Sequence, residues 1–497
     1  MEPVTQIPTE SRVTTGAGTE VPAPPAPKGL LDAYFKISAR GSTLATEVRG
    51  GLTTFMAMAY IIVLNPILLS GADINGHHLS ASQVTTATAL AAAVTTIAMG
   101  LIGNVPLAAA AGLGVSAALS TIIVPHCSWS EAFGFCVIYG ALIVLMVVSG
   151  LREKVMNGIP LPLKHAITMG IGLFIAFIGL VNAGFVGRNP ANPVQLGTNA
   201  QGHLEGWPVA LFAFTLLLIF VLQARKTPGA ILIGIVSGTV IAVVVNALGW
   251  VSADAWGGPT SVPTLHGSPF SAPNFGLFGH ISVFGAFSSG KAGMGFISAS
   301  VAVFTLVLAG FFDAMATIIG VGTEAGLADE QGRMPGLTKA LLVDGAGGMM
   351  GGLAGASGNT VFVESATGVG EGARTGLASV VTGGVFALML FFSPLAQVVP
   401  GQVAAAALVV VGSMMMAQAR HIPWADREIA IPAFLMCAVM PMTYSITAGV
   451  GAGVVSYVAI KAGTGKWRAP GGLLWGLTVV FLVYFFIGPI QRILGVH

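Results

Sequence analysis

Long runs of apolar residues, separated by short polar segments, follow one another along almost the whole chain. Most of these runs approach the roughly 20 residues that an α-helix needs to cross the hydrocarbon core of a bilayer. The pattern predicts an all-α polytopic membrane protein with fourteen spans, at about residues 49–69, 82–102, 104–121, 130–150, 164–183, 207–224, 229–249, 296–322, 336–354, 357–373, 376–394, 402–419, 429–441 and 444–460. A last apolar run, 471–490, fits either a fifteenth crossing or a helix lying on the membrane.

One predicted span, the tenth, breaks the helical pattern. Residues 355–373 read GASGNTVFVESATGVGEGA: a polar patch, a short extended run Val361–Val363, then the lone carboxylate Glu364. The stretch Ala366–Gly370 that follows is too rich in glycine for a regular helix. Irregular backbone at membrane depth is tolerated only where protein or a water-filled cavity surrounds it. An ionisable group there marks a substrate or ion pathway, so the segment indicates the half-unwound binding element of a secondary transporter.

Composition strengthens the membrane prediction. The 497 residues are 54% hydrophobic and 8% charged, against about 25% charged in a soluble protein. Three cysteines without metal spacing, and glycine-rich stretches that lack the Lys-Ser/Thr of a P-loop, indicate no metal, cofactor or ATP site. Scattered Lys and Arg argue against a nucleic-acid partner, and no nucleophilic constellation indicates an enzyme.

The distribution of lysine and arginine predicts the orientation. With the N-terminus in the cytoplasm and fourteen alternating spans, eighteen of the 21 basic residues fall on the cytoplasmic side and only Arg188 and Lys291 on the outer side. This bias follows the positive-inside rule. Residues 1–28, rich in Pro, Thr and Glu and without a signal-peptide core, are expected to be a disordered tail, and 30–37 a short interfacial helix.

Two sequence matches predict an inverted duplication of seven spans. Residues 57–62 of the first span reappear at 314–319, an offset of 257, and residues 110–117 of the third span reappear at 366–373, an offset of 256. Paired glycine-interrupted segments place the substrate where they meet near the midplane, so the third and tenth spans form the predicted site. The chain then divides into a tail (1–28), a first repeat (29–249), an outer connection (250–295), a second repeat (296–460) and a C-terminal segment (461–497).

Three carboxylates lie within the predicted spans and away from their ends: Asp313, Asp344 and Glu364. Removal from water disfavours the charged form of a carboxylate, so Glu364 and Asp313, near mid-membrane, can exchange a proton and also accept hydrogen bonds from a polar ring. The alternative is that each acid only stabilises helix packing, and this alternative is strongest for Asp344, which stands among glycines. The glycine run 345–358 is itself best explained by close helix contact.

At these residues the chain resembles the nucleobase:cation symporter-2 superfamily, and within it the AzgA-like hypoxanthine/guanine/adenine permeases. The resemblance covers nearly the whole chain after the tail, and its specific points are FKISARGSTLATEVRGGLTTFMAMAYIIVLNP (35–66), PLKHAITMGIGLFIAFIGL (162–180), FFDAMATIIGVGTEAGLADEQGRMPG (311–336), VFVESATGV (361–369) and IPAFLMCAVMPMTYSITAGVGAG (431–453).

The resemblance implies two inverted seven-span repeats, with a core domain (spans 1–4 and 8–11), a gate domain (spans 5–7 and 12–14) and short strands in spans 3 and 10. It also implies proton-coupled uptake of purine nucleobases (hypoxanthine, guanine, adenine) across the cytoplasmic membrane, often by homodimers. In this family the carboxylate of span 10 binds the base, and here that carboxylate is Glu364. Asp313 matches the second acid of a D-x-x-D pattern in span 8.

The candidate site follows from the positions of the acids and broken spans together with the family resemblance. The expected substrate-binding residues are Glu364, Asp313, Phe362, Val363, Ser365, Ala110, Ala111 and Thr360, with Phe362 stacking on the base and with Asp313 and Glu364 coupling to the proton. The chain departs from the family pattern at Gly310, where the first D-x-x-D acid is absent, and at Val361-Phe362, where a polar and aromatic pair is usual. The preferred purine and the coupling ion therefore stay open. The alternatives are a transporter of uracil, xanthine or a small anion with the same fold, or a passive channel.

Overall fold

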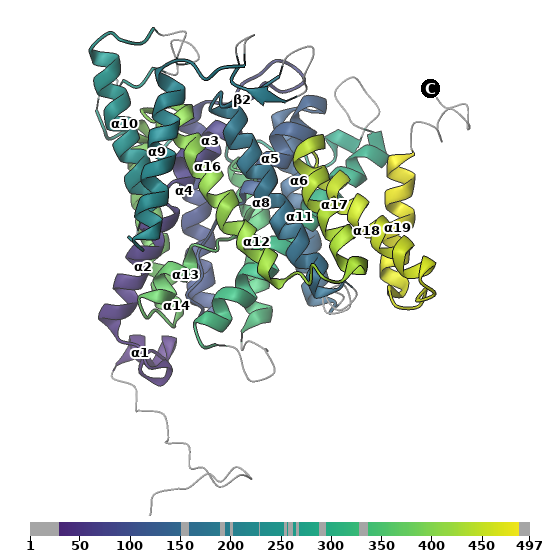
Figure 1. Ribbon diagram of the computed structural model, residues 1–497. Helices are drawn as coiled ribbons and strands as arrows, with labels where there is room; N and C mark the ends of the chain where they lie inside the picture. Colours follow the sequence, from purple (N-terminus) through teal and green to yellow (C-terminus); the bar gives the residue numbers. More distant parts are fainter. Residues whose placement is uncertain are drawn as a thin grey trace, which may run out of the picture.

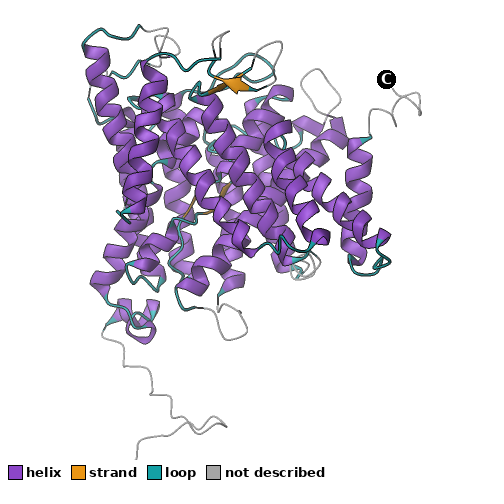
Figure 2. Ribbon diagram, viewed as in Figure 1, coloured by secondary structure: helices purple, strands orange, loops and turns teal. Residues whose placement is uncertain are grey.

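The computed structural model describes residues 29–150, 159–188, 194–198, 202–227, 229–252, 256, 262–264, 268–287, 295–327 and 336–486. The predicted tail at 1–28 and the end of the last apolar run, 487–490, lie outside the described residues. The molecule is a bundle of upright helices, with short strands in its interior and one at its upper edge (Figure 2). Eight of the described helical segments are long and apolar enough to cross a bilayer on their own.

The first seven predicted spans appear as helical segments, the third of them broken by a strand. They are α2 (Leu44–Met58) with α3 (Ile61–Leu68), α4 (Ala81–Ala98) with a π-helical turn at Met99–Gly103, β1 (Ala109–Ala111) with α5 (Leu113–Ala118), α6 (Trp129–Val148), α8 (Leu161–Asn182), α9 (Trp207–Ala224) and α10 (Ala230–Ala247). A short helix, α1 (Leu30–Phe35), precedes them as predicted, and a small hairpin of β2 (Val186–Gly187) and β3 (Gln195–Leu196) follows α8.

The second seven repeat this arrangement, with the strand again in the third segment. They are α11 (Gly295–Glu324), α12 (Leu337–Ala354), β4 (Asn359–Val361) with α13 (Ser365–Gly370), α14 (Gly376–Met389) continued by α15 (Ser393–Gln397), α16 (Gly401–Met415) with a 3-10 turn at Met416–His421, α17 (Arg427–Thr443) and α18 (Ile446–Gly463). After them α19 (Gly471–Phe485) stands upright beside α18 at one edge of the bundle (Figure 1). Its described part is apolar but shorter than the eight candidate spans.

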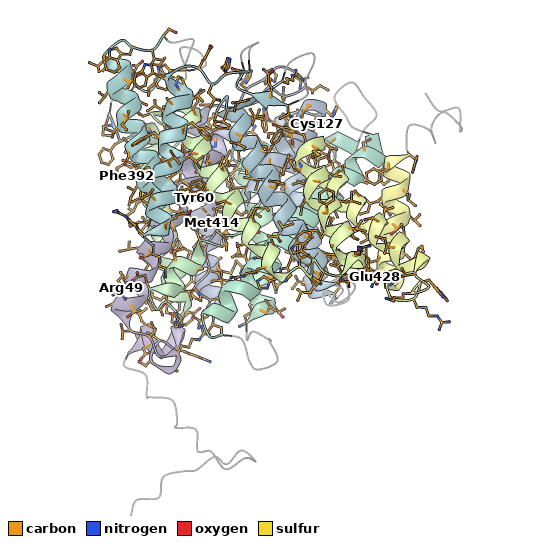
Figure 3. All side chains as sticks on the ribbon, in the orientation of Figure 1. Arg49, Tyr60, Cys127, Phe392, Met414 and Glu428 are labelled. Carbon is orange, nitrogen blue, oxygen red and sulfur yellow. The ribbon has the colours of Figure 1, made fainter. Side chains whose placement is uncertain are left out.

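Helix packing divides the bundle into two groups. The core group contains α2–α6 and α11–α14, in which α12 lies against α6 and α4, and α14 against α4 and α2. The gate group contains α8–α10 and α16–α18, in which α16 packs on α8 and α9, and α17 on α8 and α18. In Figure 1 the gate helices stand in front of the fainter core helices. Arg49, one of the basic residues predicted at the cytoplasmic side, and Glu428 lie toward the same end of the bundle, and Cys127 lies toward the other (Figure 3).

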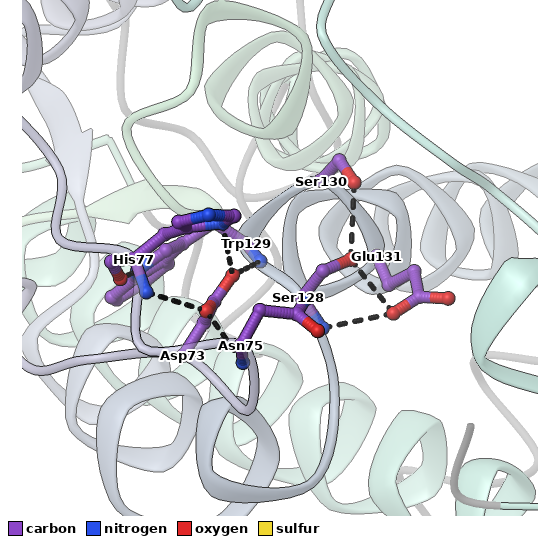
Figure 4. A network of polar contacts seen from close by, with 7 residues as sticks. All are labelled: Asp73, Asn75, His77, Ser128, Trp129, Ser130 and Glu131. Carbon is purple, nitrogen blue, oxygen red and sulfur yellow. Dashed lines mark hydrogen bonds and ion pairs between the residues drawn. The ribbon is translucent and has the colours of Figure 1, made fainter. Parts of the chain in front are cut away.

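Polar contacts fix the outer ends of the core helices. Asp73, in the loop after α3, accepts the backbone N–H groups of Asn75 and His77 at 2.9 Å and of Trp129 at 3.3 Å, and so ties this loop to the start of α6 (Figure 4). Glu131 closes a capping box with Ser128 at the same helix end. The described part of the outer connection crosses the outer ends of the same group, since backbone N–H groups of Ser271, Asn274, Gly279 and Ser282 donate to Phe391, Thr86, Leu353 and Ser130.

Three local expectations differ from the structure. A proline within an apolar span predicts a kink at Asn65-Pro66, but the break lies earlier, at Ala59–Tyr60 between α2 and α3, and Pro66 itself lies inside α3. The stretch Ala366–Gly370 does form a helix, α13. Its glycine serves packing, because a Cβ on Gly368 would lie 2.5 Å from the carbonyl oxygen of Gly50 in α2.

The third difference concerns the register of the repeat. The sequence match between 110–117 and 366–373 aligns the end of β1 with α13, a strand with a helix. The strands themselves correspond at an offset of 250 (Ala109 and Asn359), and the helices after them at 252 (Leu113 and Ser365). The pairing of the third and tenth segments is confirmed, but the alanine and glycine match that suggested it is shifted.

Candidate functional site

Two short strands cross at the centre of the core group and carry the site. β1 pairs antiparallel with β4, with Ala109 opposite Val361, Ala110 opposite Thr360, and Ala111 opposite Asn359. The ladder continues at both ends, because Phe362 N–H donates to the Ala108 carbonyl and Gly112 N–H donates to the Gly358 carbonyl, each at 2.9 Å. The two strands thus satisfy much of each other's backbone, which an isolated extended segment in a membrane could not do.

Side chains from neighbouring helices complete the hydrogen bonding of this extended backbone. The Thr96 hydroxyl on α4 both donates to the Ala109 carbonyl at 2.8 Å and accepts from the Ala109 N–H at 3.0 Å. Asp344 on α12, 2% exposed, accepts the Val361 N–H at 3.1 Å. Asp344 therefore holds the binding strand in place, which is the structural alternative weighed for it from the sequence.

A second polar cluster joins four segments next to the strands. The Asn65 amide on α3 donates to the Thr88 hydroxyl at 2.8 Å and to the Ala356 carbonyl at 2.6 Å, and accepts from the Ser116 hydroxyl at 2.7 Å. The Ser116 hydroxyl also lies 2.7 Å from that of Ser357, a residue with φ of 79° at the turn before β4. This cluster fixes the turn from which β4 begins.

Glu364 stands where β4 ends and α13 begins. Its carboxylate is 3% exposed, and its Oε1 accepts a hydrogen bond from the Tyr60 hydroxyl at 2.5 Å. Tyr60 lies at the break between α2 and α3, so the irregular points of the first and tenth segments meet at this carboxylate. Figure 3 places Tyr60 and Met414 close together about halfway along the bundle.

A cavity of about 230 Å³ opens on this carboxylate between the two helix groups. Its core wall includes Tyr60, Phe362, Val363, Glu364 and Thr317, and its gate wall Thr168, Ile175, Val411, Met414, Met415, Gln418 and Arg420. Most of this lining is apolar, with a few polar groups that converge, as is usual for small-molecule sites. Gln418 and Arg420 belong to the end of α16 and its 3-10 turn that the lysine and arginine distribution predicts to be cytoplasmic, so the cavity extends from Glu364 toward that end.

The candidate residues from the tenth segment divide into two sets. Phe362, Val363 and Glu364 line the cavity. Ser365 is fully buried, and its hydroxyl accepts from the Ala108 N–H at 3.0 Å and donates to the Phe362 carbonyl at 2.7 Å, so it fixes the strand crossing. Thr360 is buried in β4 with no hydrogen-bond partner for its hydroxyl among the described residues. Ser365 and Thr360 thus lie beside the cavity and not in its wall.

The candidates from the first repeat and from α11 lie differently. Ala110 and Ala111 are fully buried in β1 and support β4 from behind. Asp313 belongs to α11, four residues before Thr317, which lines the cavity; its side chain lies outside what the structure describes.

Sequence reasoning missed the hydroxyl, amide and guanidinium groups that complete the cavity. Tyr60 lies in the repeated AMAYII stretch, five residues before Asn65-Pro66, so a helix break in the first span was a usable signal for it. Thr317 occupies the position of Tyr60 in the repeated stretch 314–319, so the same signal could have identified it. Thr168, Gln418 and Arg420 gave no such signal, because single polar residues near span ends are common in membrane helices. They are recognised only once the two groups are assembled.

The fold and the site define a class of protein: a multi-pass membrane transporter with two inverted seven-segment repeats and a substrate cavity at the crossing of its broken segments. Comparison with known proteins narrows this class. A family profile described as "Permease family" (Xan_ur_permease) matches residues 45–452. The chain belongs to this family, the nucleobase:cation symporter-2 family, and is a protein of the cell membrane.

Two relatives span most of the chain. It is 36% identical over 445 residues to the adenine permease AdeP of Escherichia coli (strain K12), which covers 89% of this chain and 92% of that protein. It is 37% identical over 461 residues to the guanine/hypoxanthine permease PbuG of Bacillus subtilis (strain 168), covering 92% and 99%.

Among solved structures the likeness is one of fold. The transmembrane domain of a cyanobacterium bicarbonate transporter, BicA, superposes with a TM-score of 0.58 at 17% identity, covering 84% of this chain and 97% of that one. The structure of SLC26A9 superposes with a TM-score of 0.57 at 12% identity, covering 84% and 66%. These transporters have the same inverted arrangement of seven and seven segments, which confirms the predicted architecture.

Proposed function

We propose that the protein takes up purine nucleobases such as hypoxanthine, guanine and adenine by proton symport with alternating access. The observation that carries the proposal is the buried Glu364 carboxylate, which faces a mostly apolar cavity at the crossing of the two strands. The relatives named as adenine and guanine/hypoxanthine permeases support the same substrate class. Transport would leave the base chemically unchanged, so the protein is not proposed to be an enzyme.

The cavity suits a flat, polar-edged ring. Ring N–H groups of a purine would donate to the Glu364 carboxylate, whose position is fixed by the Tyr60 hydroxyl. The Phe362 ring, whose centroid lies 6.5 Å from that of Tyr60, would cover one face of the base. Ile175, Val411 and Met414 on the gate wall would contact the other face.

The proton would be carried by the acidic groups at the same place. A protonated Glu364 would no longer attract the Tyr60 hydroxyl as a charged acceptor does, since hydrogen bonds to ionised groups are about twice as strong as neutral ones. A base that binds the ionised Glu364 and a proton that neutralises it would compete for this carboxylate, so for the two to be carried together the proton would reside on Asp313 while Glu364 binds the base. Asp313 is proposed as second ligand or proton carrier, because its helix contributes Thr317 to the cavity.

Alternating access would arise from movement of the core group against the gate group. The cavity lies between the two groups and extends toward the cytoplasm, which corresponds to an inward-facing state. Bases would leave past Gln418 and Arg420. We also propose a homodimer, which cross-linking of the protein in native membranes would test.

Uptake of radiolabelled hypoxanthine into cells that lack their own purine permeases tests the proposal. Each assay is run with and without a protonophore, and in competition with guanine, adenine, xanthine, uracil, sulfate and bicarbonate. We expect accumulation that the protonophore abolishes and that guanine or adenine blocks. Accumulation insensitive to the protonophore would refute proton coupling, and competition by sulfate or bicarbonate alone would replace the purine with an anion.

A further inference from the structure

A second hollow lies on the lipid-facing surface of the core group, away from the substrate cavity. It has a volume of about 460 Å³ and lies between α4, α6 and α12, where Val94, Ala98, Ile102, Val144, Ala346 and Met350 line it. The one hydroxyl in its wall, that of Thr95, accepts a hydrogen bond from the Asn359 amide at 3.0 Å and so is engaged toward the interior. The hollow is therefore an apolar surface at membrane depth.

The glycine run of α12 explains why the surface is hollow. A Cβ on Gly345 would lie 2.9 Å from a methyl group of Val144 on α6, and one on Gly347 would lie 2.4 Å from a methyl group of Thr95 on α4. These contacts draw α12 inward between its two neighbours. Ala346, the small residue between the two glycines, is exposed and forms the floor of the hollow.

The hollow runs along the helices and has the length of one lipid leaflet. α4 and α12 are antiparallel, so Ile102 lies near Leu342 at the cytoplasmic end, and Val94 near Met350 toward mid-membrane. Eight residues of α-helix rise about 12 Å. Half of the roughly 30 Å hydrocarbon core is about 15 Å, so the hollow covers most of the inner leaflet.

The cytoplasmic mouth of the hollow carries positive charge at the level of the lipid headgroups. The Tyr34 hydroxyl on α1 donates to the Leu101 carbonyl at 2.8 Å, which docks α1 beside Ile102. α1 exposes Leu30 and Leu31, as a helix in the membrane interface does. Lys36 at the end of α1 and Lys339, one turn before Leu342 on α12, both have exposed side chains.

We propose that this hollow is a binding site for an anionic phospholipid of the inner leaflet, with one acyl chain over Ala346 and the phosphate between Lys339 and Lys36. The apolar lining matches the chain, and the two ammonium groups match the headgroup charge. The hollow lies directly behind β4. Thr95 in its wall accepts a hydrogen bond from the Asn359 side chain, and Asp344, which follows the lining residue Val343 on α12, accepts one from the Val361 N–H. A bound lipid would thus stabilise the packing that positions β4.

The test measures lipid binding without transport. The full-length protein is purified in detergent, delipidated, and titrated with dioleoyl-phosphatidylglycerol or dioleoyl-phosphatidylcholine while its thermal unfolding is followed, and bound lipid is counted by native mass spectrometry. We expect phosphatidylglycerol to raise the melting temperature at lower concentration than phosphatidylcholine. Lys339→Gln should require about fivefold more phosphatidylglycerol for the same shift, and Ala346→Leu, which fills the hollow, should lose the shift with both lipids.

Matched substitutions elsewhere on the lipid-facing surface serve as controls. Lys226→Gln and Ala210→Leu change exposed residues at the end of α9 and on α9, in the gate group, and should titrate like the parent protein. The proposal is overturned if Lys339→Gln and Lys226→Gln titrate alike, or if the parent responds equally to both lipids. If Ala346→Leu does not fold, the lysine pair decides the outcome.

Discussion

The core and gate groups both contain close glycine contacts, but the core group also contains a network of buried side-chain hydrogen bonds between its segments. In the core group, buried side chains make directional hydrogen bonds between segments far apart in the sequence, as Asn65, Asn359 and Ser365 do. In the gate group, helices meet through glycines, and a Cβ on Gly172 would lie 2.5 Å from that of Met415, while one on Gly412 would lie 2.4 Å from the Gly172 carbonyl oxygen. The core group requires directional hydrogen bonds because its backbone is irregular at the strands. The gate group consists of regular helices, for which close van der Waals packing suffices.

This difference assigns separate tasks to the two groups. Hydrogen bonds define one geometry, so they suit the part that binds the base and must not deform. Backbone contact through small residues gives van der Waals packing without fixed partners. The hydrogen bonds at Asn65, Thr96 and Ser365 each join segments of the core group, and the cavity lies where the two groups meet. A rigid core that moves against a separately packed gate is the arrangement that alternating access requires.

The largest effect is expected at the carboxylate in the core. Glu364→Gln keeps the size of the side chain but removes the negative charge of the group that accepts hydrogen bonds from the Tyr60 hydroxyl and from the base. Two hydrogen bonds to a charged acceptor would become bonds to a neutral one, which are about half as strong, so uptake of hypoxanthine should fall by roughly 100-fold. Uptake per amount of folded protein, with the amount taken from size-exclusion chromatography, is the measurement. Glu371→Gln, which changes a partly exposed acid paired with Arg49, is the control and should retain uptake. Full transport by Glu364→Gln would contradict the site.

Removal of the central hydrogen-bond cluster should destabilise the core group. Asn65→Leu deletes three buried hydrogen bonds of a fully buried side chain. At about 0.6 kcal/mol for each bond within a membrane bundle, the expected loss is about 2 kcal/mol. Thermal unfolding of the purified protein would measure it. Asn182→Leu, at the exposed end of α8, is the matched control. An unchanged melting temperature for Asn65→Leu would mean that the core group is also held mainly by packing.

Overpacking should destabilise the gate group to a comparable or smaller extent. Gly412→Ala places a methyl group 2.4 Å from the Gly172 carbonyl oxygen and 2.6 Å from the Ala176 side chain, so α8 and α16 must separate. Such strain costs about 1–3 kcal/mol. The melting temperature and uptake would both be measured. Gly384→Ala on α14, where the added Cβ meets no atom within 4 Å, is the control and should be neutral or stabilising. Equal stability of the two variants would show that the gate contacts are loose.

The sequence predicted the core group better than the gate group, for a physical reason. An acid, a proline and glycine-rich interruptions within apolar spans are costly in lipid, so they identified Glu364, the broken first span and the paired third and tenth segments. The partners of Glu364 could not be found this way. Tyr60 lies 304 residues before it in the chain, and Thr168 and Gln418 reach the cavity only through packing of the gate group. The register of the repeat was missed because alanine and glycine repeat everywhere in small-residue helices.

The link between the broken first span and the carboxylate gives a finer test of the core. Tyr60→Phe removes only the hydroxyl that donates to Glu364 at 2.5 Å and keeps the ring beside Phe362. Loss of one hydrogen bond to a charged group should raise the hypoxanthine concentration for half-maximal uptake about tenfold. Concentration-dependent uptake would measure this change. Tyr457→Phe on α18 is the gate-group control. If the maximal rate falls while the half-maximal concentration stays constant, Tyr60 does not position the base-binding carboxylate.

The smallest effects are expected at two carboxylates outside the spans, one in each group. Burial opposes ionisation of Asp73, but the N–H groups of His77, Asn75 and Trp129 outweigh it and lower its pKa below the usual 3.8. Hydrogen bonds from Lys461 and Lys466 lower the pKa of Glu428 from 4.5 to about 2. Because both pKa values are lower in the folded state, each group stabilises the protein above its unfolded pKa, and this stabilisation is lost as the pH falls through the folded value.

The melting-temperature difference between the parent and either Asp73→Asn or Glu428→Gln should therefore be constant from about pH 5 to 8 and shrink below about pH 4. Added salt should reduce the difference for Glu428, which forms ion pairs with Lys461 and Lys466 at the membrane surface, more than for the buried Asp73, which accepts hydrogen bonds from backbone N–H groups. Thermal scans across pH and salt concentration would measure both. An equal salt response at the two sites would show that the helix ends of the core and gate groups are stabilised by the same kind of polar contact. The contrast between directional and non-directional contacts would then hold only at membrane depth.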